Sequence, residues 1–132
     1  MYEYYPGTVI SATILACSGL ALVACASAGG QTPPLACNLK AISEADRPRY
    51  TSLVKRLRLA LSDPAELSDG YAFNLDTDKL PLPELAEWIS MERLCCPFLN
   101  FNLEAQSNGQ SRLTLRGPAG AKDILRDEFL GR

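Results

Sequence analysis

Two tight-turn signals flanked by alternating hydrophobic residues limit the folds open to this chain. Asp69-Gly70 and Asn108-Gly109 are dipeptides typical of β-hairpin turns. A short strand, Ala65-Glu66-Leu67, is expected before the first turn. Hydrophobic and polar residues alternate after the first turn and on both sides of the second, with the hydrophobic positions at Tyr71, Phe73, Leu75, Leu99, Phe101, Leu103, Ala105, Leu113 and Leu115. Because hairpin strands pair antiparallel, the pattern predicts an antiparallel sheet of about four strands.

Helical periodicity surrounds these strands. The first helix is expected to begin at Ser43 or, because of Pro48, nearer Asp46, and to end before Asp63-Pro64. Its hydrophobic positions recur every four residues, at Leu53, Leu57 and Leu61.

Two further helices are expected. Pro83 suits the first turn of the second, which carries Leu85, Trp88, Ile89 and Met91 and is stopped by Pro97. The third contains Ala121, Ile124, Leu125 and Phe129 and closes at Gly131. The order α-β-β-α-β-β-α predicts an α+β domain with its helices packed on one face of the sheet.

The N-terminal region differs in composition from this domain. No charged residue occurs from Thr8 to Gly30, which is typical of a signal peptide or membrane anchor. We therefore expect residues 1–28 to direct export or anchor the chain, 29–36 to form a linker, and 37–132 to form a single domain. Cleavage is expected either before Cys25, giving a lipoprotein, or after Ala28, and the destination is the periplasm or the membrane. Glu3 is a departure from this pattern, because signal peptides begin with basic residues.

Composition excludes two kinds of ligand. The chain has 13 basic and 15 acidic residues, a net charge of −2, and no basic stripe, so nucleic acid is not expected as a partner. There is also no glycine-rich phosphate-binding pattern between a strand and a helix, so a nucleotide is not expected. The only predicted association is with the membrane, through the N-terminal segment, and protein partners are not indicated.

Three cysteines of the domain carry the main functional signal. Of five in the chain, Cys37, Cys95 and Cys96 remain once the N-terminal segment is set aside. Three is an odd number for an oxidising compartment, since pairing leaves one thiol over. Pro97 biases Cys96 out of the helical conformation, so both adjacent sulfurs could turn toward one point. If Cys37 lies beside them, the three sulfurs form a ligand set for Zn²⁺, Cu(I), Hg(II) or As(III).

Glu92 lies one helical turn before the cysteine pair, on the hydrophobic side of the second predicted helix. A carboxylate beside thiols is a candidate metal ligand or proton carrier. The competing interpretation is a structural hydrogen bond or salt bridge at the end of the helix.

A resemblance adds to this interpretation. The segments Cys37-Asn38-Leu39 and Asp69–Phe73, together with the block Glu87–Phe98 of pattern E-W-I-x-x-E-R-x-C-C-P-F, resemble a family of small, largely uncharacterised bacterial proteins. The resemblance covers about Cys37 to Phe129 and implies a shared fold. Related C-C-P-F segments are associated with heavy-metal-responsive regulators, which favours mercury or arsenic chemistry by analogy.

Three functions therefore remain open. The first is a binding protein, not an enzyme, that captures a soft metal or metalloid ion through Cys37, Cys95 and Cys96, with Glu92 as a further ligand. The second is a domain in which Cys37 forms a structural disulfide with Cys95 or Cys96. The third is an enzyme of the organomercurial-cleaving type, in which thiols hold mercury and Glu92 supplies a proton.

Overall fold

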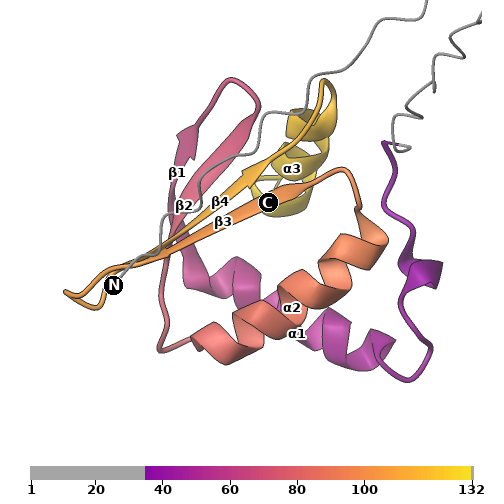
Figure 1. Ribbon diagram of the computed structural model, residues 1–132, viewed down its shortest axis with the longest axis horizontal. Coiled ribbons are helices and arrows are strands. Elements are labelled where there is room, and N and C mark those ends of the chain that lie inside the picture. Colours follow the sequence, from indigo (N-terminus) through magenta and orange to yellow (C-terminus); the bar gives the residue numbers. More distant parts are fainter. Residues whose placement is uncertain (1–34, 132) are drawn as a thin grey trace, which may run out of the picture. The chain divides into compact units, whose positions relative to one another are not determined.

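The computed structural model describes residues 35–131 and contains the predicted α+β domain (Figure 1). A short 3₁₀ helix, η1 (Leu39–Ala41), precedes the first α-helix. The order of the remaining elements matches the predicted order α-β-β-α-β-β-α. They are α1 (Arg47–Ala60), β1 (Leu61–Glu66), β2 (Gly70–Leu75), α2 (Leu82–Cys95), β3 (Asn100–Ala105), β4 (Ser111–Arg116) and α3 (Ala121–Phe129).

The four strands of this domain form one antiparallel sheet in the order β1-β2-β4-β3. Each hairpin pairs its own two strands, and β2 joins the hairpins by pairing with β4 from Gly70 opposite Arg116 to Leu75 opposite Ser111. Gly70 is required by this contact, because a Cβ atom there would lie 1.9 Å from the carbonyl oxygen of Leu115. The sequence predicted the hairpins but not this central pairing.

The junction between α1 and β1 differs from the sequence prediction. The helix ends at Ala60, and the strand begins at once with Leu61, which pairs with Leu75. The expected short strand at Ala65-Glu66-Leu67 is therefore the end of a longer strand that stops at Glu66. A bulge between Ser62 and Ala65 contains Asp63, at φ 48°, and Pro64. The strand therefore continues through the Asp63-Pro64 pair, which the sequence predicted to follow the end of the first helix as a break between elements.

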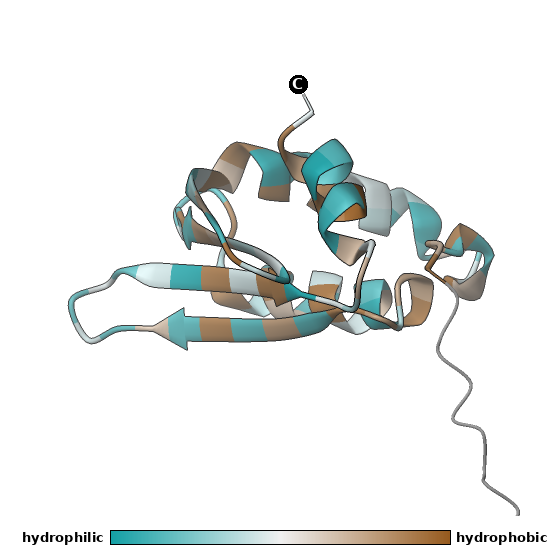
Figure 2. Cartoon of the chain, turned by 90° about the horizontal axis from the view of Figure 1, so that it is seen from above, coloured by the Kyte–Doolittle hydropathy of each residue, from teal (hydrophilic) through white to brown (hydrophobic). Residues whose placement is uncertain are grey.

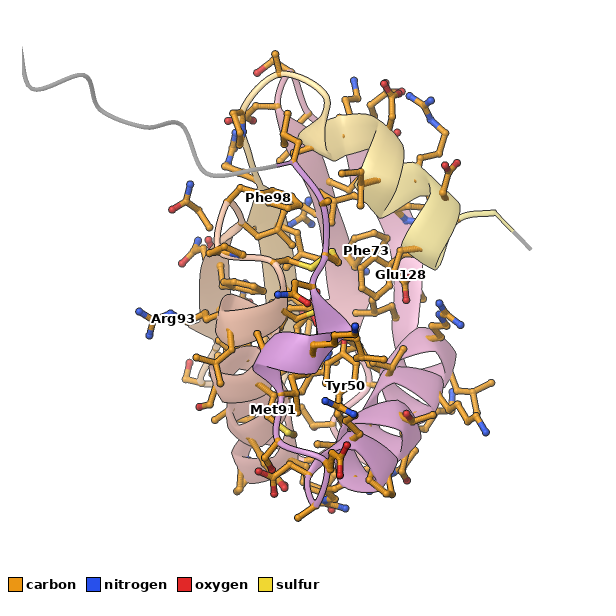
Figure 3. The ribbon with its side chains drawn as sticks, turned by 90° about the vertical axis from the view of Figure 1, so that its right-hand side faces the viewer. Tyr50, Phe73, Met91, Arg93, Phe98 and Glu128 are labelled. Atoms are coloured by element: carbon orange, nitrogen blue, oxygen red, sulfur yellow. A yellow bond between two sulfur atoms is a disulfide. The ribbon has the colours of Figure 1, made fainter. Side chains whose placement is uncertain are left out.

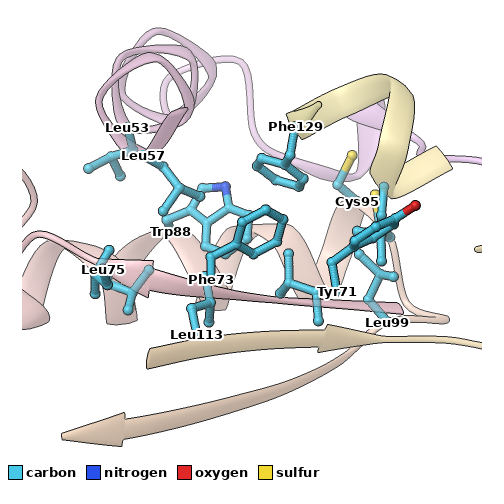
Figure 4. Close-up of a cluster of buried hydrophobic side chains, with 14 of the residues drawn as sticks. Leu53, Leu57, Tyr71, Phe73, Leu75, Trp88, Cys95, Leu99, Leu113 and Phe129 are labelled. Carbon is cyan, nitrogen blue, oxygen red and sulfur yellow. The ribbon is translucent and has the colours of Figure 1, made fainter. Parts of the chain in front are cut away.

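The helices pack on one face of the sheet and enclose the core (Figure 4). Trp88 of α2 is 1% exposed and makes edge-to-face contacts with Phe101 and Phe129, at 5.7 Å and 6.3 Å between ring centroids. Hydrophobic and hydrophilic residues alternate along β3 and β4 (Figure 2), as the sequence predicts, although Ala105 at the end of β3 is exposed. The buried face of α2 thus packs against both the sheet and α3.

Among the described residues, no helix has both the length and the hydropathy that a membrane crossing requires. The predicted signal peptide or anchor at 1–28 and most of the predicted linker lie outside those residues.

Candidate thiol site

The candidate site begins where α2 ends. Cys95 is the last residue of this helix, and Cys96 follows it with φ −122° and ψ 71°, outside the helical region. The predicted effect of Pro97 on Cys96 is therefore confirmed. The Cys96 N–H still donates to the carbonyl oxygen of Glu92 at 2.7 Å, so Cys96 makes the last helical hydrogen bond of α2. Both cysteine side chains point inward, with Cys95 2% exposed and Cys96 1% exposed.

The segment before α1 brings the third cysteine to this point. The backbone N–H of Asn38 donates to the carbonyl oxygen of Cys95 at 2.8 Å, which closes the end of α2. The Asn38 side chain accepts a bond from the Lys40 N–H and so begins η1. Cys37, next to Asn38, is exposed and forms a disulfide with Cys96 across 59 positions of sequence.

The three sulfur atoms lie together. The Sγ atoms of Cys37, Cys95 and Cys96 are all within 4.8 Å of one another. Cys95 is the free thiol of the group and belongs to the buried hydrophobic core (Figure 4). The structure thus brings together the three cysteines that the sequence singles out. This arrangement is compatible both with a structural disulfide and with an ion held by three thiolates.

Glu92 is buried beside this group but is not part of it. Its side chain is 5% exposed, as expected from its place on the hydrophobic side of the helix. The hydroxyl of Tyr50, on α1, donates to Glu92 Oε2 at 2.6 Å. Burial raises the pKa of Glu92, and the negative charge of Glu128 raises it further, while the Tyr50 hydrogen bond opposes both. Glu92 therefore has a polar partner of its own.

The surroundings of Cys95 disfavour its thiolate. Burial raises the pKa of this thiol most, and the nearby charge of Glu92 adds to the effect. The nearby polar groups of Tyr50 and of the Asn38 backbone lower its pKa but do not reverse the direction. Arg93 gives no compensation, because its side chain is exposed and points away from the domain (Figure 3). These surroundings thus favour the thiol form of Cys95 over the thiolate.

Tyr50 is the site residue that the sequence interpretation missed. Tyr50 is on α1, beneath η1 in the view of Figure 3, and its ring packs against the core while its hydroxyl reaches Glu92 of α2. A signal was present, since Tyr50 is three residues before Leu53 and seven before Leu57, on the hydrophobic side of α1. A tyrosine hydroxyl on a buried face needs a hydrogen-bond partner, and a carboxylate on the neighbouring helix is a suitable one.

Comparisons of this chain with models of protein families, with curated proteins and with solved structures found no match. The chemistry of the site is therefore inferred from its own residues.

Proposed function

We propose that the reduced domain captures a soft metal or metalloid ion through Cys37, Cys95 and Cys96. The observation that carries this proposal is the approach of all three Sγ atoms to within 4.8 Å of one another. With metal–sulfur bonds of about 2.3 Å, as for zinc, three sulfurs around one ion lie roughly 4 Å apart. The cluster is already on this scale, so loading requires only that Cys37 and Cys96 separate after reduction.

Thiolate sulfur selects the ion. Zn²⁺, Cu(I), Hg(II) and As(III) all accept such ligands, and no histidine occurs in the chain to shift the preference toward harder ions. A two-electron thiol reductant first converts the disulfide to two thiols. Each metal–sulfur bond then replaces one S–H bond, so arsenous acid would form three arsenic–sulfur bonds and release three water molecules. Glu92 becomes a further ligand only if Tyr50 gives up its hydrogen bond.

The test is a titration of the reduced full-length chain with each of the four ions, with Cys17 and Cys25 replaced by serine so that only the three cysteines of the domain remain. Native mass spectrometry is expected to show one ion per chain, with loss of that species in Cys96→Ser. Far-UV circular dichroism of each variant checks that the fold persists. Glu92→Gln, which alters no sulfur, is the matched control and is expected to retain the ion. If the reduced chain shows no thiol-dependent binding of any of the four ions, the proposal is wrong.

A second candidate function rests on the disulfide itself. The bond between Cys37 and Cys96 ties the segment before α1 to the end of α2, which favours a structural staple in an exported domain. We place this chain in the periplasm or at the membrane as part of the same proposal. Alkylation of freshly lysed cells in denaturant, followed by mass spectrometry, separates the two states, because Cys95 and Cys96 are buried in the folded domain. One alkylated cysteine in the domain indicates the staple, whereas three indicate the ion-binding form.

A further inference from the structure

We propose that the cluster is a thiol–disulfide exchange site in which Cys37 is the shared sulfur and Cys95 and Cys96 alternate as its partner. This activity is independent of ion capture, because it needs no metal and begins from the oxidised chain. It gives the Cys95 thiol a chemical role. A purely structural Cys37–Cys96 disulfide would not need a third sulfur.

The backbone places Cys37 beside both partners. Its disulfide holds it to Cys96, and the bond from the Asn38 N–H to the Cys95 carbonyl holds the next residue against the other cysteine. The Cys95 sulfur is within 4.8 Å of both sulfurs of the disulfide. The proposed exchange therefore needs Cys37 Sγ to move by no more than a few ångströms from one partner sulfur to the other.

Exposure determines where an outside thiol can attack. Cys37 is exposed, whereas Cys95 and Cys96 are 2% and 1% exposed. Because Cys37 is the exposed residue of the disulfide, we assign the attack of a small thiol such as glutathione to Cys37. Attack at one sulfur of a disulfide releases the other as a thiolate, so the leaving group is Cys96.

The exchange balances without any net oxidant. The thiolate of glutathione forms a bond to Cys37 Sγ, and the bond from Cys37 to Cys96 breaks to leave a Cys96 thiolate. Cys95 passes its proton to that thiolate and then attacks Cys37 Sγ. The Cys37–Cys95 bond forms, and glutathione leaves as the thiolate that entered. The disulfide has moved by one residue, and Cys96 is now the free thiol.

The test compares full-length variants that share the replacements Cys17→Ser and Cys25→Ser, in the presence of a chelator. Each reduced chain is treated with oxidised glutathione, and intact mass is followed with time. In Cys96→Ser we expect a glutathione adduct that forms and is then lost as Cys37 bonds to Cys95. The double variant Cys95→Ser/Cys96→Ser is expected to retain the adduct. Cys95→Ser is the matched control and should close the Cys37–Cys96 bond. A stable adduct on Cys37 beside a free Cys95 thiol in Cys96→Ser, with the parent's circular dichroism, would overturn the proposal.

If Cys96→Ser does not fold, the exchange is tested in the parent chain, which carries only Cys17→Ser and Cys25→Ser. The oxidised parent is incubated with a catalytic amount of reduced glutathione, quenched in acid and alkylated in denaturant. Tandem mass spectrometry then locates the label. The proposal predicts label on Cys95 alone at the start and a growing share on Cys96. Label confined to Cys95 at every time would refute it.

Discussion

Replacing Cys37 by alanine should be the most informative stability measurement on this domain. The side chain is exposed, so the change removes the disulfide to Cys96 and little packing. The two cysteines are 59 positions apart, and the entropy of closing a loop of that length in the unfolded chain corresponds to about 4 kcal/mol. The expected loss is therefore about 4 kcal/mol of unfolding free energy, a large share of the total for a domain of this size.

The other two cysteines provide internal comparisons. Cys95→Ala keeps the disulfide and removes one buried sulfur atom, so its cost should be only about 1 kcal/mol. Cys96→Ala removes both the disulfide and a side chain that is 1% exposed, so its cost should exceed that of Cys37→Ala. The expected order of stability is Cys95→Ala, then Cys37→Ala, then Cys96→Ala.

Urea unfolding at equilibrium, followed by circular dichroism and tryptophan fluorescence, measures these differences in chains that also carry Cys17→Ser and Cys25→Ser. Adding a reductant to the parent should reproduce the loss seen in Cys37→Ala, and it should leave Cys37→Ala unchanged. If Cys37→Ala lies within about 1 kcal/mol of the parent and reductant has no effect, the disulfide does not constrain the unfolded chain, and the loop-closure reasoning fails.

Two further predictions concern buried groups outside the cluster. Burial raises the pKa of Glu92 above its usual 4.5, so the folded chain holds this proton more tightly than the unfolded chain does. The stability of the parent relative to Glu92→Gln should therefore fall as pH rises from 4.5 through the raised pKa. Unfolding free energies of both chains from about pH 4 to about pH 8 test this, and a difference that stays constant or grows with pH would contradict it. Gly70→Ala should cost about 2–3 kcal/mol in urea unfolding, because the new Cβ meets the backbone of β4, whereas Ser68→Ala in the adjacent turn should cost little. A Gly70→Ala chain as stable as Ser68→Ala would show that the two strands can move apart.

Local signals account for the parts of the fold that the sequence predicted. The hairpins depend on turn residues and on alternation over a few positions, and the end of α2 depends on Pro97. These are interactions between near neighbours in the chain. They were sufficient for the class, for the order of elements and for the change of backbone direction at Cys96.

The features that the sequence did not predict depend on contacts between distant segments. The pairing of β2 with β4 joins residues more than thirty positions apart. The one sequence feature that this pairing requires is the glycine at position 70, where β2 approaches the β4 backbone closely. The bulge at Asp63 and Pro64 forms because Leu61 pairs with Leu75, which overrides the local preference for a break. The hydrogen bond from Tyr50 to Glu92 likewise joins two helices, so neither residue alone indicates it.

The proposed ion site and the disulfide share the sulfur atoms of Cys37 and Cys96, so the two states exclude each other. An ion that binds only the reduced chain must therefore shift the disulfide equilibrium toward the thiols. At a free ion concentration 100 times the dissociation constant, binding stabilises the reduced chain by about 2.7 kcal/mol. For a two-electron couple this raises the reduction potential by roughly 60 mV. The shift should vanish in Cys95→Ser if that sulfur is needed for the ion, because the Cys37–Cys96 disulfide itself does not include Cys95. The Cys95→Ser variant thus separates ion binding from the Cys37–Cys96 disulfide: it loses the ion's effect on the reduction potential but keeps that disulfide.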